Sequence, residues 1–240
     1  MNPMLQWLEE CGDSFYRAFI EKDRYLAYFR GFRTTLILSL FAVLLGVGIG
    51  VILALIKYMA NHMKKGVILR VLNWIANIYI AIIRGTPVYV QLLIIYFIIF
   101  AQLDASPIVA GVICFGINSS AYVAEVIRAG IEAVDGGQME AGRSLGLGWG
   151  QTMISIILPQ AIKNILPALG NEFITLIKET AILGTIAVLD VTKAAQNVGA
   201  ITYEYLPPLL IAAAMYLVVV IILTKLLGIF ERRLAQSDRR

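Results

Sequence analysis

Length, composition and charge place this chain in a membrane. Of its 240 residues, 59% are hydrophobic and 15% are charged, and the mean hydropathy is +0.79. Several apolar runs approach or exceed the roughly 20 residues that cross a bilayer as a helix, which indicates an all-α polytopic membrane protein. The net charge of +4 does not indicate nucleic-acid binding, because the basic residues flank apolar segments instead of forming a patch on a soluble fold.

The first 33 residues predict an amphipathic segment at the membrane interface. They carry five basic and five acidic residues, interleaved with aromatic rings that can keep one side wet. No short apolar core with a small-residue cleavage site follows a basic start, so we expect no removable signal peptide. A partly ordered polar tail is the alternative for this segment.

Five membrane spans follow within a predicted transmembrane domain over residues 34–231, before a basic tail at 232–240. The predicted spans cover residues 35–56, 72–100, 108–127, 166–189 and 207–230. The second run is too long for one straight span and contains Arg84-Gly85-Thr86-Pro87. Because proline lacks an amide hydrogen and crowds the preceding turn, we expect a kink there, which gives Arg84 and Pro87 a structural or gating role.

The distribution of cations predicts which loops lie inside. Basic residues follow the first span, occur through 128–163 and close the chain, whereas the loops 101–107 and 190–205 carry few. The positive-inside rule then predicts an external amino terminus and a cytoplasmic carboxyl terminus. The cations after the first span are Lys57, Lys64, Lys65 and Arg70, with His62 among them.

Several kinds of chemistry are missing from the sequence. There is no phosphate-binding GxxxxGK[ST] loop, no HExxH motif and no cysteine–histidine cluster, so we expect no catalytic residue and no metal site. Cys11 and Cys114 receive no chemical role. Gly46 and Gly50 lie four residues apart in the first span and predict close helix packing. No internal repeat is visible, and five spans do not divide into two halves, which disfavours a self-sufficient secondary transporter.

A polar interruption at 128–163 contains a short predicted helix over about 138–147. Gly136 and Gly137 precede it, and Gly146 and Gly148 end it. A helix of about ten residues is marginal alone in water, so it must pack on a partner or on its own bundle. Its small residues suit a groove, with Leu145 as an apolar anchor and polar contacts from Glu140 and Arg143.

This segment carries a resemblance to a known family. The residues Glu140-Ala141-Gly142-Arg143-Ser144-Leu145-Gly146, nine further residues and Ile156-Ile157-Leu158-Pro159 resemble the EAA motif of ATP-binding-cassette (ABC) importer permeases. Gly142 replaces the second alanine, and we expect this change to keep the site small at a slight cost in helix propensity. Arg84-Gly85-Thr86-Pro87, the segment 121–125 and Gly137-Gln138 are similar to the polar amino acid branch, which includes histidine, glutamine and arginine permeases.

The resemblance implies a type I importer in the bacterial inner membrane, with residues 140–146 as a cytoplasmic coupling helix. Two permease subunits, as a homodimer or a heterodimer, would work with a cytoplasmic ATPase dimer and an external amino acid-binding protein. ATP and Mg would be used by the ATPase partner, and this chain would bind no cofactor and no nucleic acid. The solute implied is a polar amino acid, basic ones included, and membrane lipid surrounds the spans.

Polar residues at membrane depth are the candidates for the solute site, because they are costly there unless they face a cavity or a bundle interior. Lys178 is the preferred partner for a solute carboxylate. The candidate hydrogen-bonding groups are Gln91, Asn118 and Ser119, and Glu172 or Glu179 would accept the ammonium group. Structural pairing is the alternative for each residue, and Glu125 is expected to pair with Arg128. An ion-coupled carrier or a membrane-embedded enzyme is the competing function.

Overall fold

The computed structural model describes residues 3–62, 66–103 and 105–236. Lys64, Lys65 and the basic residues at 239–240, which entered the topology prediction, lie outside this range, as does Asp104 of the predicted external loop. All regular secondary structure in the described residues is helical. The prediction of an all-α protein is therefore confirmed.

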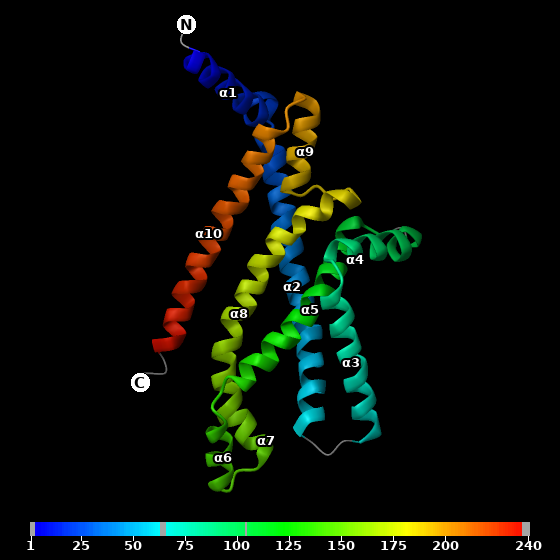
Figure 1. The fold of residues 1–240 in the computed structure, drawn as a ribbon, viewed down its shortest axis with the longest axis vertical. Coiled ribbons are helices and arrows are strands. Elements are labelled where there is room, and N and C mark those ends of the chain that lie inside the picture. The colour runs from blue at the N-terminus through cyan, green and yellow to red at the C-terminus, as the bar shows by residue number, and fades with distance from the viewer. Residues whose placement is uncertain (1–2, 63–65, 104, 237–240) are drawn as a thin grey trace.

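Five helical segments are long and apolar enough to cross a membrane, as predicted. They cover Glu21–His62, Val67–Gly85, Pro107–Glu132, Trp149–Ile186 and Leu206–Leu234. The labelled helices are α1 (Pro3–Phe19), α2 (Tyr25–His62), α3 (Val67–Gly85), α4 (Val88–Ile94), α5 (Pro107–Glu132), α6 (Gly136–Ser144), α7 (Trp149–Thr152), α8 (Leu158–Glu179), α9 (Val191–Thr202) and α10 (Leu206–Gln236). Figure 1 shows α1 and α9 at one end of the molecule and α6 and α7 at the other.

The second predicted span is broken in two instead of being kinked. Helix α3 ends at Gly85, Thr86 and Pro87 are extended, and α4 begins at Val88. Proline disfavours the helical region for the residue before it, and Thr86 with ψ of 146° has left that region. Helix α4 continues through a π-helical turn at Ile95–Ile99 and runs off to the side of α3 (Figure 1). The span consists of α3 alone, and it starts five residues before the prediction.

Helices α2 and α5 pack closely where the sequence places small residues. A Cβ added to Gly46 would lie 2.9 Å from the side chain of Ser119, and one added to Gly50 would lie 2.6 Å from Cγ1 of Val123. The small-residue face predicted for the first span is thus confirmed, and it serves packing within the chain.

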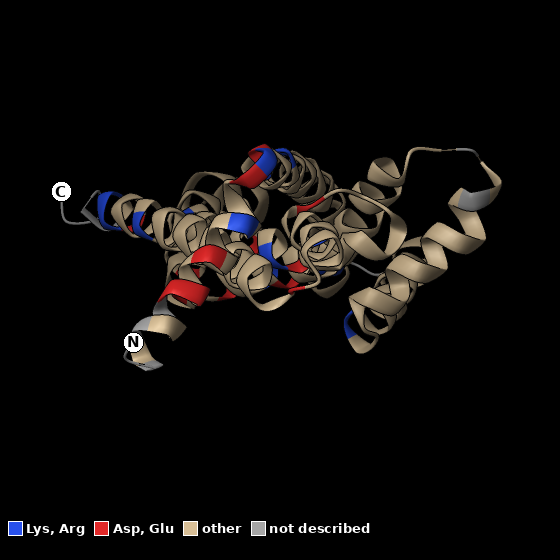
Figure 2. Ribbon diagram, turned by 90° about the horizontal axis from the view of Figure 1, so that it is seen from above, with Lys and Arg blue, Asp and Glu red and all other residues tan. Residues whose placement is uncertain are grey.

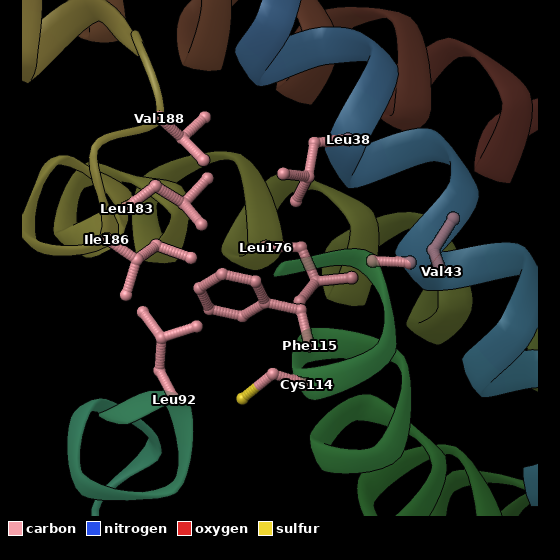
Figure 3. Packing of buried hydrophobic residues seen from close by; sticks show 10 residues of the cluster. Leu38, Val43, Leu92, Cys114, Phe115, Leu176, Leu183, Ile186 and Val188 are labelled. Carbon is pink, nitrogen blue, oxygen red and sulfur yellow. The ribbon is translucent and has the colours of Figure 1, made fainter. Parts of the chain in front are cut away.

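The main core lies where α2, α4, α5 and α8 meet the helical turn that follows α8. Figure 3 shows how Phe115 of α5 faces Leu176 of α8 and the side chains that enter from α2 and α4. The labelled core residues are Leu38, Val43, Leu92, Cys114, Phe115, Leu176, Leu183, Ile186 and Val188. Cys114 is a buried packing residue with a free thiol. Seen along the long axis, most of the ribbon carries no charge, as expected inside a bilayer (Figure 2).

Candidate functional site

Helix α6 is a short helix that is capped at both ends. Oδ1 of Asp135 accepts a hydrogen bond from the amide of Gly137 at 2.7 Å, which caps the amino terminus. At the other end Gly146 adopts a φ of +84°, and the amides of Gly146 and Leu147 donate to the carbonyls of Arg143 and Gly142. This is a Schellman ending. The helix therefore covers 136–144, two to three residues earlier than predicted, because Asp135 and Gly146 set its limits.

Among residues 140–146 of the motif, only one is buried in the protein. Gly142 is buried, and a Cβ added to it would lie 2.5 Å from Cγ2 of Thr152 and 3.2 Å from Cδ1 of Ile156. A Cβ at this position would thus force Thr152 or Ile156 to move, a consequence beyond the loss of helix propensity expected from the sequence. The other residues of 140–146 are exposed, and Leu145 has 81% of its surface accessible. An apolar side chain held out in this way suits a partner protein.

At the same end of the bundle, an ion-pair cluster joins α2 to α5. Lys57 Nζ lies 2.8 Å from Oε1 of Glu125, and Arg128 reaches Oε2 of Glu125 at 2.9 Å and Glu132 at 2.6 Å. The predicted pairing of Glu125 with Arg128 is confirmed. Lys57, which adds the contact between helices, was predicted only as a topological cation.

The amides of Gln91 and Asn118 hold the break between α3 and α4. Nε2 of Gln91 lies within 2.8 to 3.1 Å of the carbonyls of Ile83 and Thr86, and 2.7 Å from the Thr86 hydroxyl. Nδ2 of Asn118 donates to Oε1 of Gln91 at 3.0 Å. Helix ends leave backbone carbonyls without partners, and Gln91 satisfies them here. Both amides are nearly buried, and their hydrogen bonds within the chain account for their presence there without a solute. Contact of Gln91 or Asn118 with a solute stays a prediction.

A second polar pair connects α5 to α8. Oγ of Ser119 donates to Oε1 of Glu172 at 2.7 Å, and Gly46 of α2 lies against Ser119. Glu179 lies seven residues beyond Glu172 and therefore shares its face of the helix. In the described part of the chain, neither carboxylate takes part in an ion pair. Two carboxylates without an ion-pair partner among the described residues therefore lie on one face of α8.

Lys178 and Arg84 lie apart from these two polar pairs. Lys178 is exposed on α8, and it makes no ion pair with described residues. The guanidinium of Arg84 lies over the ring of Tyr122, 5.4 Å from its centroid, as a cation–π contact. Pro87 occupies the position before α4. The six residues predicted for solute binding therefore form two hydrogen-bonded pairs, with Glu179 and Lys178 outside them.

The opposite end of the bundle contains a site that sequence reasoning missed. Both carboxylate oxygens of Asp190 cap α9 by accepting the amides of Thr192 and Lys193, and Tyr216 of α10 donates to Oδ2 at 3.2 Å. Burial raises the pKa of Asp190 in spite of these donors. Gly31 of α2 approaches the backbone of Asp190 so closely that an added Cβ would lie 2.5 Å from its carbonyl oxygen. The signal in the sequence was the aspartate itself, because Asp is a preferred residue at the N-cap of a helix.

The bundle and its separate exposed helix define the class to which the chain belongs. Residues 46–236 match the family described as "binding-protein-dependent transport system inner membrane component", and the chain is a member of that family. It is a transporter permease and not itself an enzyme.

Relatives and solved structures agree with this assignment. The chain is 42% identical to "arginine transport system permease protein ArtQ" of Bacillus subtilis over 87% of its length and 92% of that protein. It is 45% identical to "putative glutamine transport system permease protein GlnP" of Rickettsia bellii, over 85% of this chain and 90% of that protein. A "crystal structure of an amino acid ABC transporter with histidines" matches with a TM-score of 0.80 at 46% identity, over 87% and 94% of the two chains. The methionine transporter MetNI shares the fold alone, at 18% identity and a TM-score of 0.72 over 92% of this chain.

Proposed function

We propose that the chain is the permease subunit of an ATP-driven importer for a polar amino acid, with basic amino acids preferred. The observation that carries this proposal is the exposed, capped helix α6 with Leu145 held outward, on a chain whose relatives are named for arginine and glutamine transport. The alternative of an ion-coupled carrier or a membrane enzyme has no such observation in its favour.

In the proposed arrangement, the chain lies in the bacterial inner membrane, and α6 docks on an ATPase dimer in the cytoplasm. ATP and Mg are used by that partner, and a second permease subunit completes the pathway. The end with α6 is then inside, which puts the carboxyl terminus inside and the amino terminus outside. Closure of the ATPase dimer moves α6, and the helices reorient between inward and outward openings. The direction of transport requires different affinities of the two states for solute and binding protein.

The preference for a basic solute follows from the charges on α8. Glu172 and Glu179 lack ion-pair partners among the described residues, so a solute that brings an ammonium or guanidinium group would satisfy them. The Ser119 hydroxyl fixes one oxygen of Glu172 and leaves the other available. Lys178 lies seven residues after Asn171 on an exposed stripe of the same helix. This stripe would face the cavity between two permeases, where Lys178 receives the solute carboxylate.

The external binding protein is expected to dock where α9 turns into α10. Tyr203 is 90% exposed and adopts a left-handed conformation with a φ of 58°. The turn is held in place, because Oγ1 of Thr202 lies 3.0 Å from the Val198 carbonyl oxygen and 3.2 Å from that of Glu204, and Arg17 of α1 pairs with Glu204 at 2.9 Å. A large ring held out on a fixed turn suits a protein interface. Figure 2, viewed from this end, shows acidic segments of the neighbouring amino-terminal helix, which favour a basic partner surface.

Reconstitution tests the whole proposal. The chain is placed in proteoliposomes with a candidate ABC ATPase, and uptake of radiolabelled arginine, glutamine and histidine is measured with and without ATP and the external binding protein. We expect uptake that requires ATP and the ATPase. Leu145→Arg should prevent assembly with the ATPase. The control is Gln196→Arg, which places the same charge on an exposed residue of α9 at the other end of the bundle. Leu217→Arg in α10 is not used as a control, because that residue lies in the membrane. Uptake driven by an ion gradient without any ATPase would refute the proposal.

A further inference from the structure

An aromatic stack joins the end of α2 to the segment that follows α6. Tyr58 and His62 lie one turn apart on α2, with ring centroids 4.2 Å apart and ring planes at 23°. Trp149, the first residue of α7, stacks on Tyr58 at 5.6 Å and 28°, and its ring lies 6.1 Å from that of His62. Rings from two distant parts of the sequence, the end of α2 and the start of α7, therefore form one cluster.

The α2 side of the stack is firmly held. Nδ1 of His62 lies 3.0 Å from the carbonyl oxygen of Tyr58, so the ring is fixed against its own helix when that nitrogen carries the proton. Lys57, next to Tyr58, pairs with Glu125 of α5. The end of α2 is thus bound to α5 by an ion pair and to Trp149 by ring contact.

The Trp149 side moves with α6. Gly142 of α6 packs against Thr152 of α7, and Oγ1 of Thr152 donates to the carbonyl of Gly148, the residue before Trp149. Between residues 136–157 and α2, the stack provides the only ring contacts, and no hydrogen bond or ion pair joins these two described parts. Trp149 is therefore a direct contact through which a displacement of α6 can reach α2.

We propose that Trp149 is a positioning residue that transmits the movement of α6 to α2 through its stack with Tyr58 and His62. Packed side chains carry coupling when they join elements that move as units. From α2 the path continues through Gly46 to Ser119, whose hydroxyl holds Glu172. The inference rests on the proposed docking of α6 on an ATPase, and it adds the contact by which the membrane helices receive that motion.

The ratio of ATP hydrolysed to solute imported measures this transmission. In proteoliposomes that contain the complete complex, Trp149→Ala should raise the ratio at least threefold, with unchanged complex yield and basal ATP hydrolysis. Trp149→Phe keeps a ring and should restore most of the coupling. Tyr58→Leu should uncouple to a similar degree, and the double variant should be no worse than either single one, because both remove the same contact. Trp74→Ala, at a side chain of α3 that is 64% exposed, is the control.

A wild-type ratio in Trp149→Ala, or additive effects in the double variant, would overturn the inference. If Trp149→Ala lowers the yield of complex, Tyr58→Leu tests the same stack from the other helix. Failure of the docking proposal looks different: Leu145→Arg would then assemble and transport normally. If Leu145→Arg blocks assembly while both stack variants remain coupled, docking stands and the role of Trp149 is wrong.

Discussion

The α6 segment and the polar pairs inside the bundle use their side chains in opposite ways. The ends of α6 are hydrogen-bonded through the Asp135 cap and the turn at Gly146, without help from the side chains of the helix. Glu140, Arg143 and Leu145 are therefore left exposed. Inside the bundle, Gln91, Asn118 and Ser119 are engaged with other parts of the chain. A surface that binds a protein can leave its groups to water, whereas a polar group at membrane depth needs a partner even without solute.

The largest effect that tests this contrast is expected at Gly142, the one buried residue of the exposed segment. Gly142→Leu should abolish transport, because a Cβ alone already lies 2.5 Å from Cγ2 of Thr152. Gly142→Ala should reduce transport several-fold, and adding Thr152→Ser should restore much of it by removing the methyl group while keeping the hydroxyl bond to Gly148. Uptake in proteoliposomes measures both variants. Full transport by Gly142→Leu would show that the close packing of α6 against Thr152 of α7 is not required.

The next effect tests whether Glu172 binds the solute in addition to accepting the hydrogen bond from Ser119. Glu172→Gln keeps the size and the acceptor for Ser119 but removes the charge. Hydrogen bonds to charged groups contribute about 1.5–3 kcal/mol, so the concentration for half-maximal uptake of a basic amino acid should rise at least tenfold. Ser119→Ala should have a smaller effect. An unchanged half-maximal concentration with Glu172→Gln would make this carboxylate a purely structural group.

The third effect concerns stability without solute. Gln91→Met keeps the length of the side chain but leaves the carbonyls of Ile83 and Thr86 and the amide of Asn118 without this partner. Each unsatisfied buried group costs about 1–3 kcal/mol, so the melting temperature of the purified chain in detergent should fall by several degrees. Gln196→Met, at an exposed residue of α9, is the control. Equal melting temperatures would mean that the break needs no support from Gln91.

Patterns that depend on neighbouring residues were predictable, and contacts between distant residues were not. The five spans follow from apolar length, the position at which the second run is disrupted from Pro87, and the pair of Glu125 with Arg128 from helical spacing. The stacking of Trp149 on Tyr58 joins residues that only the fold brings together. The same applies to Gly142, because its requirement for glycine depends on Thr152 across a turn. Gln91 was predicted as a solute ligand because a sequence does not show which carbonyls a break leaves unpaired.

The smallest effect is expected at Lys57, and it separates stability from coupling. Its ammonium pairs with Glu125 at 2.8 Å, but Arg128 holds the other carboxylate oxygen, so Lys57→Met leaves Glu125 with a partner. Because partly exposed ion pairs contribute about 1 kcal/mol or less, the melting temperature of the Lys57→Met variant should differ from that of the unmodified chain by less than about 3 °C. Glu125→Gln, which weakens both pairs, should cost more. If the end of α2 passes motion to α5 through this ion pair, Lys57→Met should raise the ATP-to-solute ratio in spite of its small effect on stability. An unchanged ratio would confine that transfer to the Gly46–Ser119 packing.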